Sequence, residues 1–247
     1  MPDAQGIFIP YGAISSDTTR YELTQESISP AYEAVFQSNS WGHSRTLYYD
    51  SYSEEMDRIV FDLDFLIVQS QSNSGDQYSR PEAWAKNVIS IGGVRHFNNS
   101  DASDDSWTWG ASIGPAEDGR LKPELAHFYD ASNTLSSSGG YAQFSGTSNA
   151  TPVVAGHLGL FLQMWADGLF GNSVPGGTVF ENRPHATTAK AMLINTAQQY
   201  AFAGFVHDLS RTHQGWGLPN LRTLYDDRAS FLITDETIPL KALQTYD

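Results

Sequence analysis

Two continuous apolar runs restrict the folds open to this chain more than any other feature. Phe65–Gln69 (FLIVQ) and Val88–Val94 (VISIGGV) are apolar at almost every position. Such runs are typical of strands buried on both faces, as in parallel sheets. Glu54–Asp64 precedes the first run and places Met56, Ile59 and other apolar residues on one side of a helix. This alternation predicts a three-layer α/β/α domain with a mainly parallel sheet.

The rest of the chain supplies further elements of the same kind. We expect a strand at Gln5–Tyr11, a helix within Thr24–Phe36, and a strand end that runs into a loop at Ser38–Gly42. Ser148–Trp165 is apolar almost all round, which indicates a helix buried in the interior, and Arg183–Tyr200 predicts another helix. With 247 residues and no internal repeat or linker, we interpret residues 1–247 as one domain.

Composition excludes several functions. The 14 basic and 28 acidic side chains give a net charge of −14, which argues against nucleic acid or an anionic membrane as partner. No apolar run reaches the roughly 18 to 20 residues that span a bilayer. The absence of cysteine rules out disulfides, thiolate zinc sites and a cysteine nucleophile within these residues.

The chemistry is concentrated in Phe144–Gly156 (FSGTSNATPVVAG). Ser148 stands where a glycine-containing approach enters the predicted buried helix. Free backbone N–H groups and the positive end of the helix dipole are therefore expected around it. Gly146 allows close approach of a bound carbonyl, and Pro152 fits the first helical turn. A serine at this position is either an activated nucleophile or simply an N-cap.

The full string resembles the nucleophile signature GTSMATPxVAG of the subtilisin-like serine peptidases, the subtilases, with Asn149 in place of the usual Met. Further blocks follow in the order of that family. They are SNSWG at 38–42, FLIVQSQSNSG at 65–75, KNVISIGGV at 86–94, GPAEDGRLKPE at 114–124, LINTA at 193–197 and HQGWGLPN at 213–220. The resemblance implies a subtilisin-like fold, an extracellular serine endopeptidase acting on peptides or proteins, and no required cofactor.

The same resemblance implies roles for individual residues. Ser148 matches the nucleophile, and Asn73 matches the side-chain donor of the oxyanion hole, which acts with the backbone N–H of Ser148. The expected substrate-binding residues are Ser40, Trp41, Gly42, Gly146 and Thr147. No metal ligand is expected at this site.

Two family motifs are absent from the sequence. Subtilases carry an aspartate in a D-S/T-G strand end and a histidine in HGTHVAG, and neither occurs here. His157 lies nine residues past Ser148, about 13 Å along the helix, which is too far for it to act as the base. His43, just after SNSWG, is the least implausible substitute for the missing histidine. Since Met1–Gln5 resembles the segment after HGTHVAG, we expect that the chain begins after the catalytic histidine. We also expect that residues from about 230 to 247 lead toward a C-terminal β-domain.

Other departures keep two alternatives open. Ser72 replaces the usual glycine before the oxyanion asparagine, and Ala126–Tyr129 replaces V-A-P-G, so an inactive homologue that serves as a binding or scaffold module is one alternative. The other is an α/β-hydrolase-type esterase, because residues 146–150 approach G-x-S-x-G. That fold needs an acid and a histidine after the serine. The sequence offers Asp208 with His185, His207 and His213.

Calcium is the one ion that the sequence suggests. Asn98–Asp105 (NNSDASDD) gathers oxygen ligands of the type calcium prefers, and subtilases commonly bind calcium in surface loops. The spacing matches no EF-hand, so a solvated acidic loop is the simpler interpretation. A structural calcium ion is therefore an expectation for this loop, and a required cofactor is not.

Overall fold

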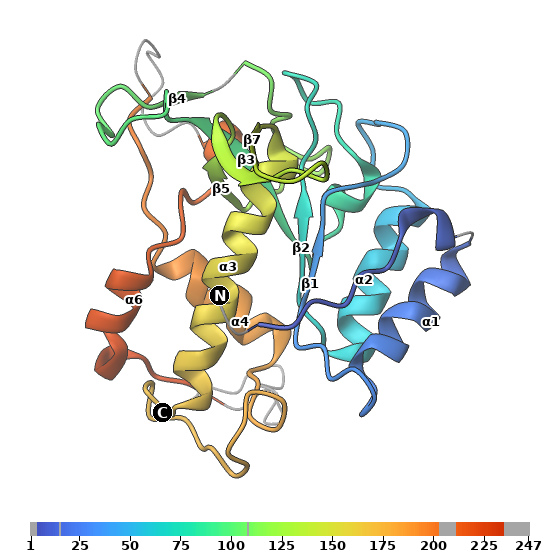
Figure 1. The fold of residues 1–247 in the computed structure, drawn as a ribbon, viewed down its shortest axis with the longest axis vertical. Coiled ribbons are helices and arrows are strands. Elements are labelled where there is room, and N and C mark those ends of the chain that lie inside the picture. Colours follow the sequence, from blue (N-terminus) through green and yellow to red (C-terminus); the bar gives the residue numbers. More distant parts are fainter. Residues whose placement is uncertain (1–3, 15, 108, 203–210, 235–247) are drawn as a thin grey trace.

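A computed structural model describes residues 4–14, 16–107, 109–202 and 211–234 of the chain. Figure 1 shows a sheet with helices packed around it. The strands are β1 (Gln37–Asn39), β2 (Ile67–Ser70), β3 (Ile89–Arg95), β4 (Ser106–Trp107), β5 (Leu125–Phe128), β6 (Ser132–Leu135) and β7 (Tyr141–Phe144). The α-helices are α1 (Asp17–Ile28), α2 (Ser51–Leu63), α3 (Thr147–Ala166), α4 (Ala186–Asn195), α5 (Arg211–Gln214) and α6 (Leu221–Asp226). Short 3-10 helices are η1 (Tyr11–Ala13), η2 (Pro81–Trp84) and η3 (Arg228–Ser230).

The main sheet is largely parallel, as the apolar runs predict. β1 pairs with β2, β2 with β3, and β3 with β5, all in parallel, whereas β4 pairs antiparallel with the end of β3. Asn39 lies opposite Gln69 in the first of these pairs. The segments that follow β1 and β2 therefore leave the sheet side by side.

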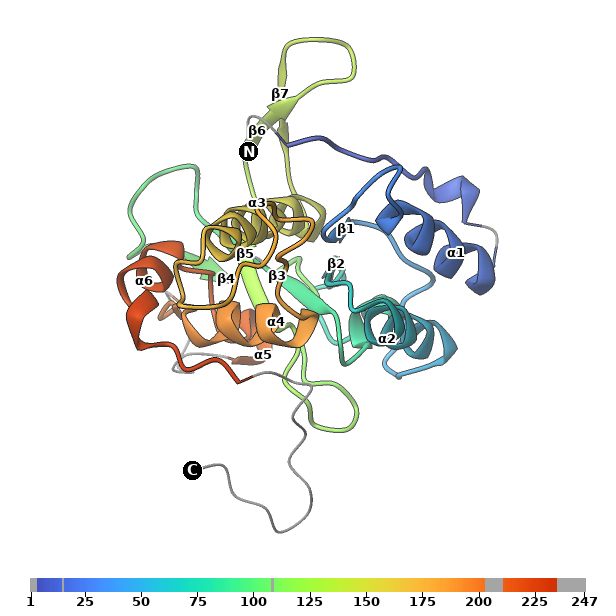
Figure 2. The same ribbon diagram turned by 90° about the horizontal axis from the view of Figure 1, so that it is seen from below.

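The core lies between this sheet and the helices on its two faces. In Figure 2, α3 covers one face, and α4 lies across the other. Apolar side chains of α2, β2, β3, α3 and α4 form one continuous cluster. This is the expected three-layer arrangement. None of the described helices is long and apolar enough to cross a bilayer.

Several predicted elements have different bounds. The strand expected at Gln5–Tyr11 is wrong: residues 4–10 have no regular structure, are largely exposed and pair with no described strand. The helix expected within Thr24–Phe36 spans Asp17–Ile28 instead. It begins there because the Ser16 hydroxyl accepts from the N–H of Thr19, and Pro30 follows its end. The other predicted strands and helices occur with bounds shifted by a few residues.

A two-stranded hairpin was not predicted. β6 and β7 pair antiparallel, and Figure 2 shows the hairpin standing away from the body. Every residue of β7 is exposed. Leu135 of β6 is 76% accessible, and Tyr141 of β7 is 82% accessible. Such strands lack the alternation of a half-buried sheet, so a hydrophobic pattern does not reveal them.

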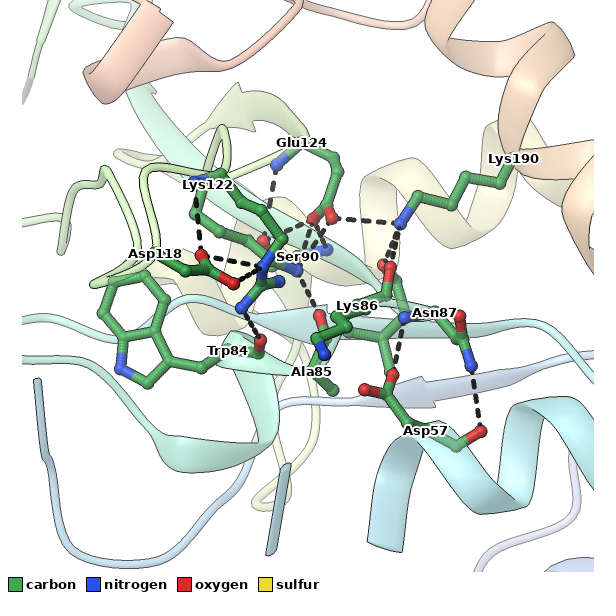
Figure 3. A network of polar contacts seen from close by, with 12 residues as sticks. Asp57, Trp84, Ala85, Lys86, Asn87, Ser90, Asp118, Lys122, Glu124 and Lys190 are labelled. Carbon is green, nitrogen blue, oxygen red and sulfur yellow. Dashed lines mark hydrogen bonds and ion pairs between the residues drawn. The ribbon is translucent and has the colours of Figure 1, made fainter. Parts of the chain in front are cut away.

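A buried polar network fixes the segment before β5 to the sheet (Figure 3). The Lys122 ammonium is fully buried and lies 2.7 Å from Glu124, while Lys190 of α4 reaches the same carboxylate at 3.0 Å. Glu124 also accepts from the N–H and hydroxyl of Ser90 at 2.7 and 2.6 Å. Lys122 further donates to the Ala85 carbonyl. One carboxylate thus joins two lysines and strand β3.

Opposing effects set the charge states in this network. Burial lowers the pKa of Lys122 to about 8, although Glu124 acts against it. Burial alone would raise the pKa of Glu124, but the two ammonium groups outweigh it and hold that pKa below its usual value.

Candidate active site

The ends of β1 and β2 meet the beginning of α3. The segment after β1 contains Ser40, and the segment after β2 contains Asn73. α3 begins at Thr147, with Gly146 as its N-cap at φ 98°, a conformation that favours glycine. Parallel strands deliver such side chains to one edge of the sheet, the usual place for a ligand in open α/β folds. The structure therefore brings together the residues that the sequence singled out.

Asn73 is held in one orientation. Its Oδ1 accepts from the N–H of Thr147 at 2.9 Å and from the Thr147 hydroxyl at 3.1 Å. Within the described chain, the Nδ2 amide group has no hydrogen-bond partner. Asn73 is exposed, so this amide is an oriented donor that a ligand can reach.

Ser148 presents a second donor beside the first. The N–H groups of Asn149 and Ala150 both bond to the carbonyl of Gly146, whereas that of Ser148 has no partner among the described residues. The Ser148 side chain is partly buried, and its hydroxyl lies 3.4 Å from the carbonyl oxygen of Ser40. The Ser148 hydroxyl and N–H therefore come directly after Thr147, which holds the Asn73 side chain, and within the described chain neither the Ser148 N–H nor Asn73 Nδ2 has a partner.

Pro152 leaves the Ser148 carbonyl free to bond outside the helix. Pro152 is the sixth residue of α3, so the expectation that it lies in the first turn is wrong. Because proline has no N–H, the carbonyl of Ser148 loses its partner four residues ahead. The Ser40 hydroxyl supplies the missing donor at 3.0 Å. A residue of the segment after β1 is in this way bonded directly to Ser148.

A charged side chain packs behind the predicted substrate-binding segment, and the sequence did not reveal this contact. A Cβ on Gly42 would lie 2.9 Å from Cβ and Cγ of Arg80, so glycine lets the Arg80 stem pack behind the segment. The carbonyl of Trp41 accepts from Gln69 at 2.7 Å. No local motif marks Arg80, because only the fold brings it to Gly42.

Ser72 has a backbone conformation that suits the glycine expected at this position from the resemblance. Its φ is 118°, in the region that L side chains avoid. Ser72 is buried, its N–H reaches the Thr147 hydroxyl at 3.3 Å, and its own hydroxyl accepts from Nε of Arg45 at 2.8 Å. Serine at position 72 therefore has a strained backbone, and its hydroxyl forms a hydrogen bond with Arg45 that a glycine could not form.

No described histidine is hydrogen bonded to Ser148. His43 instead bonds through Nδ1 to Glu82 at 2.7 Å, and Glu82 is fully buried. The ring of His43 stacks on Tyr52 at 3.7 Å. Glu82 was not predicted, since it comes from η2, a short element without a sequence motif.

The histidines of the hydrolase alternative do not gather at Ser148 either. His185 pairs with Asp64 at 2.6 Å, and His213 packs edge-on against Trp107. His207 and Asp208 lie outside the described residues. His157 donates through Nδ1 to the carbonyl of Val153 on its own helix.

The acidic loop shows no assembled calcium site. In the described part of the chain, no three His, Asp or Glu side chains converge as metal ligands. Asp101 accepts from Ser103 at 2.6 Å, and Asp104 accepts from Asn99 at 2.9 Å. Local turns therefore occupy these carboxylates, and calcium binding stays a prediction. Most of the expected link from about residue 230 to 247 lies outside the described residues, which end at 234.

Comparison with known proteins agrees with the family resemblance of the sequence motifs. A family model described as Peptidase_S8, the subtilase family, matches residues 6–217. A search of curated proteins finds no match.

Among solved structures, the prenylagaramide maturation protease PagA matches with a TM-score of 0.64 and 18% identity, over 87% of this chain and 68% of that one. The patellamide maturation protease PatA matches with 0.65 and 15%, over 87% and 70%. Sphericase matches with 0.59 and 18%, over 83% and 63%. At these identities, the structures establish the fold alone, which is the subtilisin-like α/β fold.

Proposed function

Because this chain belongs to the subtilase family, we propose that it carries the nucleophile and oxyanion hole of a serine endopeptidase. The Ser148 hydroxyl attacks the peptide carbonyl and forms an acyl-enzyme. Asn73 Nδ2 and the Ser148 N–H hold the charge on the tetrahedral oxygen. Proteolysis is the activity of the family; the residue roles are our proposal.

One observation carries this assignment. Thr147 occupies the Oδ1 of Asn73 with two hydrogen bonds, which leaves Nδ2 unpaired next to the unpaired N–H of Ser148. Donors in partly buried places, such as this N–H, seldom stay unsatisfied without a reason. A pair of fixed donors beside a hydroxyl suits an oxygen that becomes negative during reaction. Each such side-chain donor contributes roughly 3 to 4 kcal/mol to transition-state stabilisation.

The substrate is proposed to be an extended peptide. In the described chain, β1 pairs with a strand on one side only, and Ser40, Trp41 and Gly42 continue from its end. An extended peptide can pair its backbone with such a segment. Gly146 and Thr147 then lie at the reacting carbonyl. A structural neighbour, the PatG macrocyclase, was solved in complex with a peptide.

The absence of a base sets the expected activity. A serine nucleophile needs a histidine base oriented by an acid, and in the described chain Ser148 bonds to no histidine. Loss of the base reduces turnover on the order of 10⁶-fold. We therefore expect negligible peptide hydrolysis by these 247 residues alone. Measurable hydrolysis that disappears in Ser148→Ala would contradict this expectation.

A binding module is the second candidate, favoured by the same missing contact. Both candidates bind peptides, but only a working oxyanion hole stabilises a tetrahedral adduct. A peptide boronic acid distinguishes them, because boron becomes tetrahedral when it bonds to a serine oxygen.

Extracellular location also remains a proposal, based on the resemblance alone.

The experiment measures boron-11 NMR and affinity of the boronic acid. We expect a tetrahedral signal with the wild-type chain, none with Ser148→Ala, and affinity about 100-fold weaker with Asn73→Ala, as for loss of one donor. Ser145→Ala, in the adjacent loop, is the matched control and should retain the signal. Peptide binding without an adduct would favour the binding module. An adduct that is insensitive to Asn73 would overturn the assigned oxyanion hole.

A further inference from the structure

Two arginines of the described chain differ from all its other lysines and arginines. Every other described cation lies within an ion pair or over an aromatic ring. Those cations are Arg20, Arg58, Lys86, Arg95, Arg120, Lys122, Arg183, Lys190, Arg211, Arg222 and Arg228. Arg45 and Arg80 have neither kind of partner among the described residues. In a chain with a net charge of −14, this exception needs a reason.

The two arginines lie opposite each other. Thr46 and Ser79 form an antiparallel bridge with reciprocal hydrogen bonds of 2.8 and 3.1 Å. The next residue along each strand is Arg45 on one side and Arg80 on the other. Like charges directly opposite each other on paired strands are destabilising. An anion between them would reverse that effect.

Both arginines are tied to the two walls of the candidate site. Arg45 donates through Nε to Ser72, the residue before Asn73. Arg80 packs its methylene groups on Gly42 and donates through Nη1 to the carbonyl of His43. Each guanidinium therefore spends one donor on holding its position. Among the described residues the remaining donors have no hydrogen-bond partner, and none of those on Arg80 is buried without a partner.

The nearby carboxylate of Glu82 cannot serve as their partner. Glu82 is fully buried, and its oxygens accept from the N–H and ring of His43 and lie near Arg20 at 3.8 Å. Within the described ranges, no ion pair links Glu82 to either of the two arginines. Arg45 and Arg80 thus have no carboxylate partner in the part of the chain that the structure describes, and Arg45 is bonded to the segment that carries Asn73.

We propose that Arg45 and Arg80 form a specificity pocket for the carboxylate of an aspartate or glutamate side chain in the bound peptide. Guanidinium groups carried by two residues that lie opposite each other on the bridge offer donors of the kind that a carboxylate accepts. Ser72, whose φ is 118°, accepts a hydrogen bond from one of them through its hydroxyl. This inference rests on the proposed peptide site.

The test compares peptides that differ only in one charge. Blocked fluorescent hexapeptides carry Glu at one of the four central positions, with Gln and Lys versions of each, and their affinity for Ser148→Ala is measured by anisotropy. We expect one position at which Glu binds about tenfold more tightly than Gln, and Lys more weakly than both. A Gln peptide with a free C-terminal carboxylate tests whether a chain end is recognised instead. If it alone binds tightly, the proposal is wrong.

Variants locate the effect. Arg45→Gln and Arg80→Gln, each in the Ser148→Ala chain, should reduce the ratio of Glu to Gln peptide affinity to about twofold or less. Arg80→Lys, which keeps the charge and the packed stem, should retain part of it. Arg228→Gln removes one positive charge from η3 and is the matched control. Thermal midpoints confirm that each variant is folded.

Failure of the two proposals can be told apart. Equal binding of Glu, Gln and Lys peptides at every position overturns the acidic pocket but leaves the peptide site intact. No binding by any peptide overturns the peptide site and the pocket with it. A Glu preference that survives Arg45→Gln together with Arg80→Gln also refutes the pocket.

Discussion

Ser72 is a residue at which the backbone and the side chain have opposite preferences. Its φ of 118° suits glycine, yet the serine hydroxyl accepts from Arg45 and joins it to the segment that carries Asn73. Strained residues of this kind occur at functional sites, where neighbouring contacts hold them in place. The strain is thus an independent sign that the position of Arg45 matters.

Replacing Ser72 by glycine should separate stability from recognition. Relief of a positive φ is worth about 1 kcal/mol after allowance for the greater freedom of glycine in the unfolded chain. We expect Ser72→Gly to raise the free energy of unfolding by about that amount in urea titrations, while Arg45 loses its bond and the preference for Glu peptides falls. Ser74→Gly, two residues along in the same loop, is the control. A less stable Ser72→Gly protein would show that the hydrogen bonds of the serine stabilise the fold by more than its backbone strain destabilises it.

At the scale of elements, the buried Lys122–Glu124–Lys190 network connects the segment before β5, strand β3 and helix α4. Loss of one member of a buried charge network costs about 3 to 5 kcal/mol when a charge is left alone. The loss in free energy of unfolding therefore depends on which of the three residues is replaced.

Glu124→Gln should be the more damaging change, at about 3 to 5 kcal/mol, because it leaves two ammonium groups without a carboxylate. Lys122→Met should cost less, since Lys190 still neutralises Glu124 and methionine fills the volume of the buried stem. Urea denaturation of the two variants gives both values. The reverse order would mean that packing of the lysine stem, and not charge pairing, stabilises this region. Arg222→Met, at an exposed pair on α6, is the control and should change stability by less than about 1 kcal/mol.

Hydrophobic pattern and motif order predicted the central elements well. β2, β3, α2 and α3 are long or fully buried, so their sequences carry strong periodic signals. The expected strand at Gln5–Tyr11 failed because an apolar string by itself does not supply a neighbouring strand. β6 and β7 were missed because their exposed positions do not require apolar residues.

The site was predictable in part for the same reason. Asn73 follows the buried strand β2, Ser148 begins the largely buried helix α3, and both carry local motifs, so the sequence predicts that they lie close together. Arg45, Arg80 and Glu82 became visible only in three dimensions. Their pairing depends on an isolated bridge and on a contact across Gly42, which leave no periodic trace in the sequence.

At the scale of the whole molecule, acid should weaken the fold through a buried histidine. His127 of β5 is nearly inaccessible, and burial, with smaller effects of His157 and His96, lowers its pKa to about 3. Between the ordinary histidine pKa of about 6.5 and that value, the unfolded chain binds a proton that the folded chain does not. Stability due to this group is therefore complete above about pH 6.5 and declines as the pH falls.

The expected decline between about pH 6.5 and 5 is about 2 kcal/mol, from roughly 1.4 kcal/mol per pH unit. His127→Gln should remove it, because glutamine keeps an acceptor for the N–H of Phe128 but does not titrate. Urea titrations at several pH values measure the slope for both proteins. His185→Gln, at a half-exposed histidine, is the control. An unchanged slope in His127→Gln would assign acid sensitivity to other groups.

The proline at position 152 has a consequence for anyone who wishes to transplant this machinery. Because Pro152 has no N–H, the Ser148 carbonyl accepts its hydrogen bond from the Ser40 hydroxyl on another segment. The helix therefore does not fix the reactive serine by itself. A graft of residues 146–156 alone into a foreign scaffold would lose that anchor. The smallest portable unit is the helix together with the loop that bears Ser40.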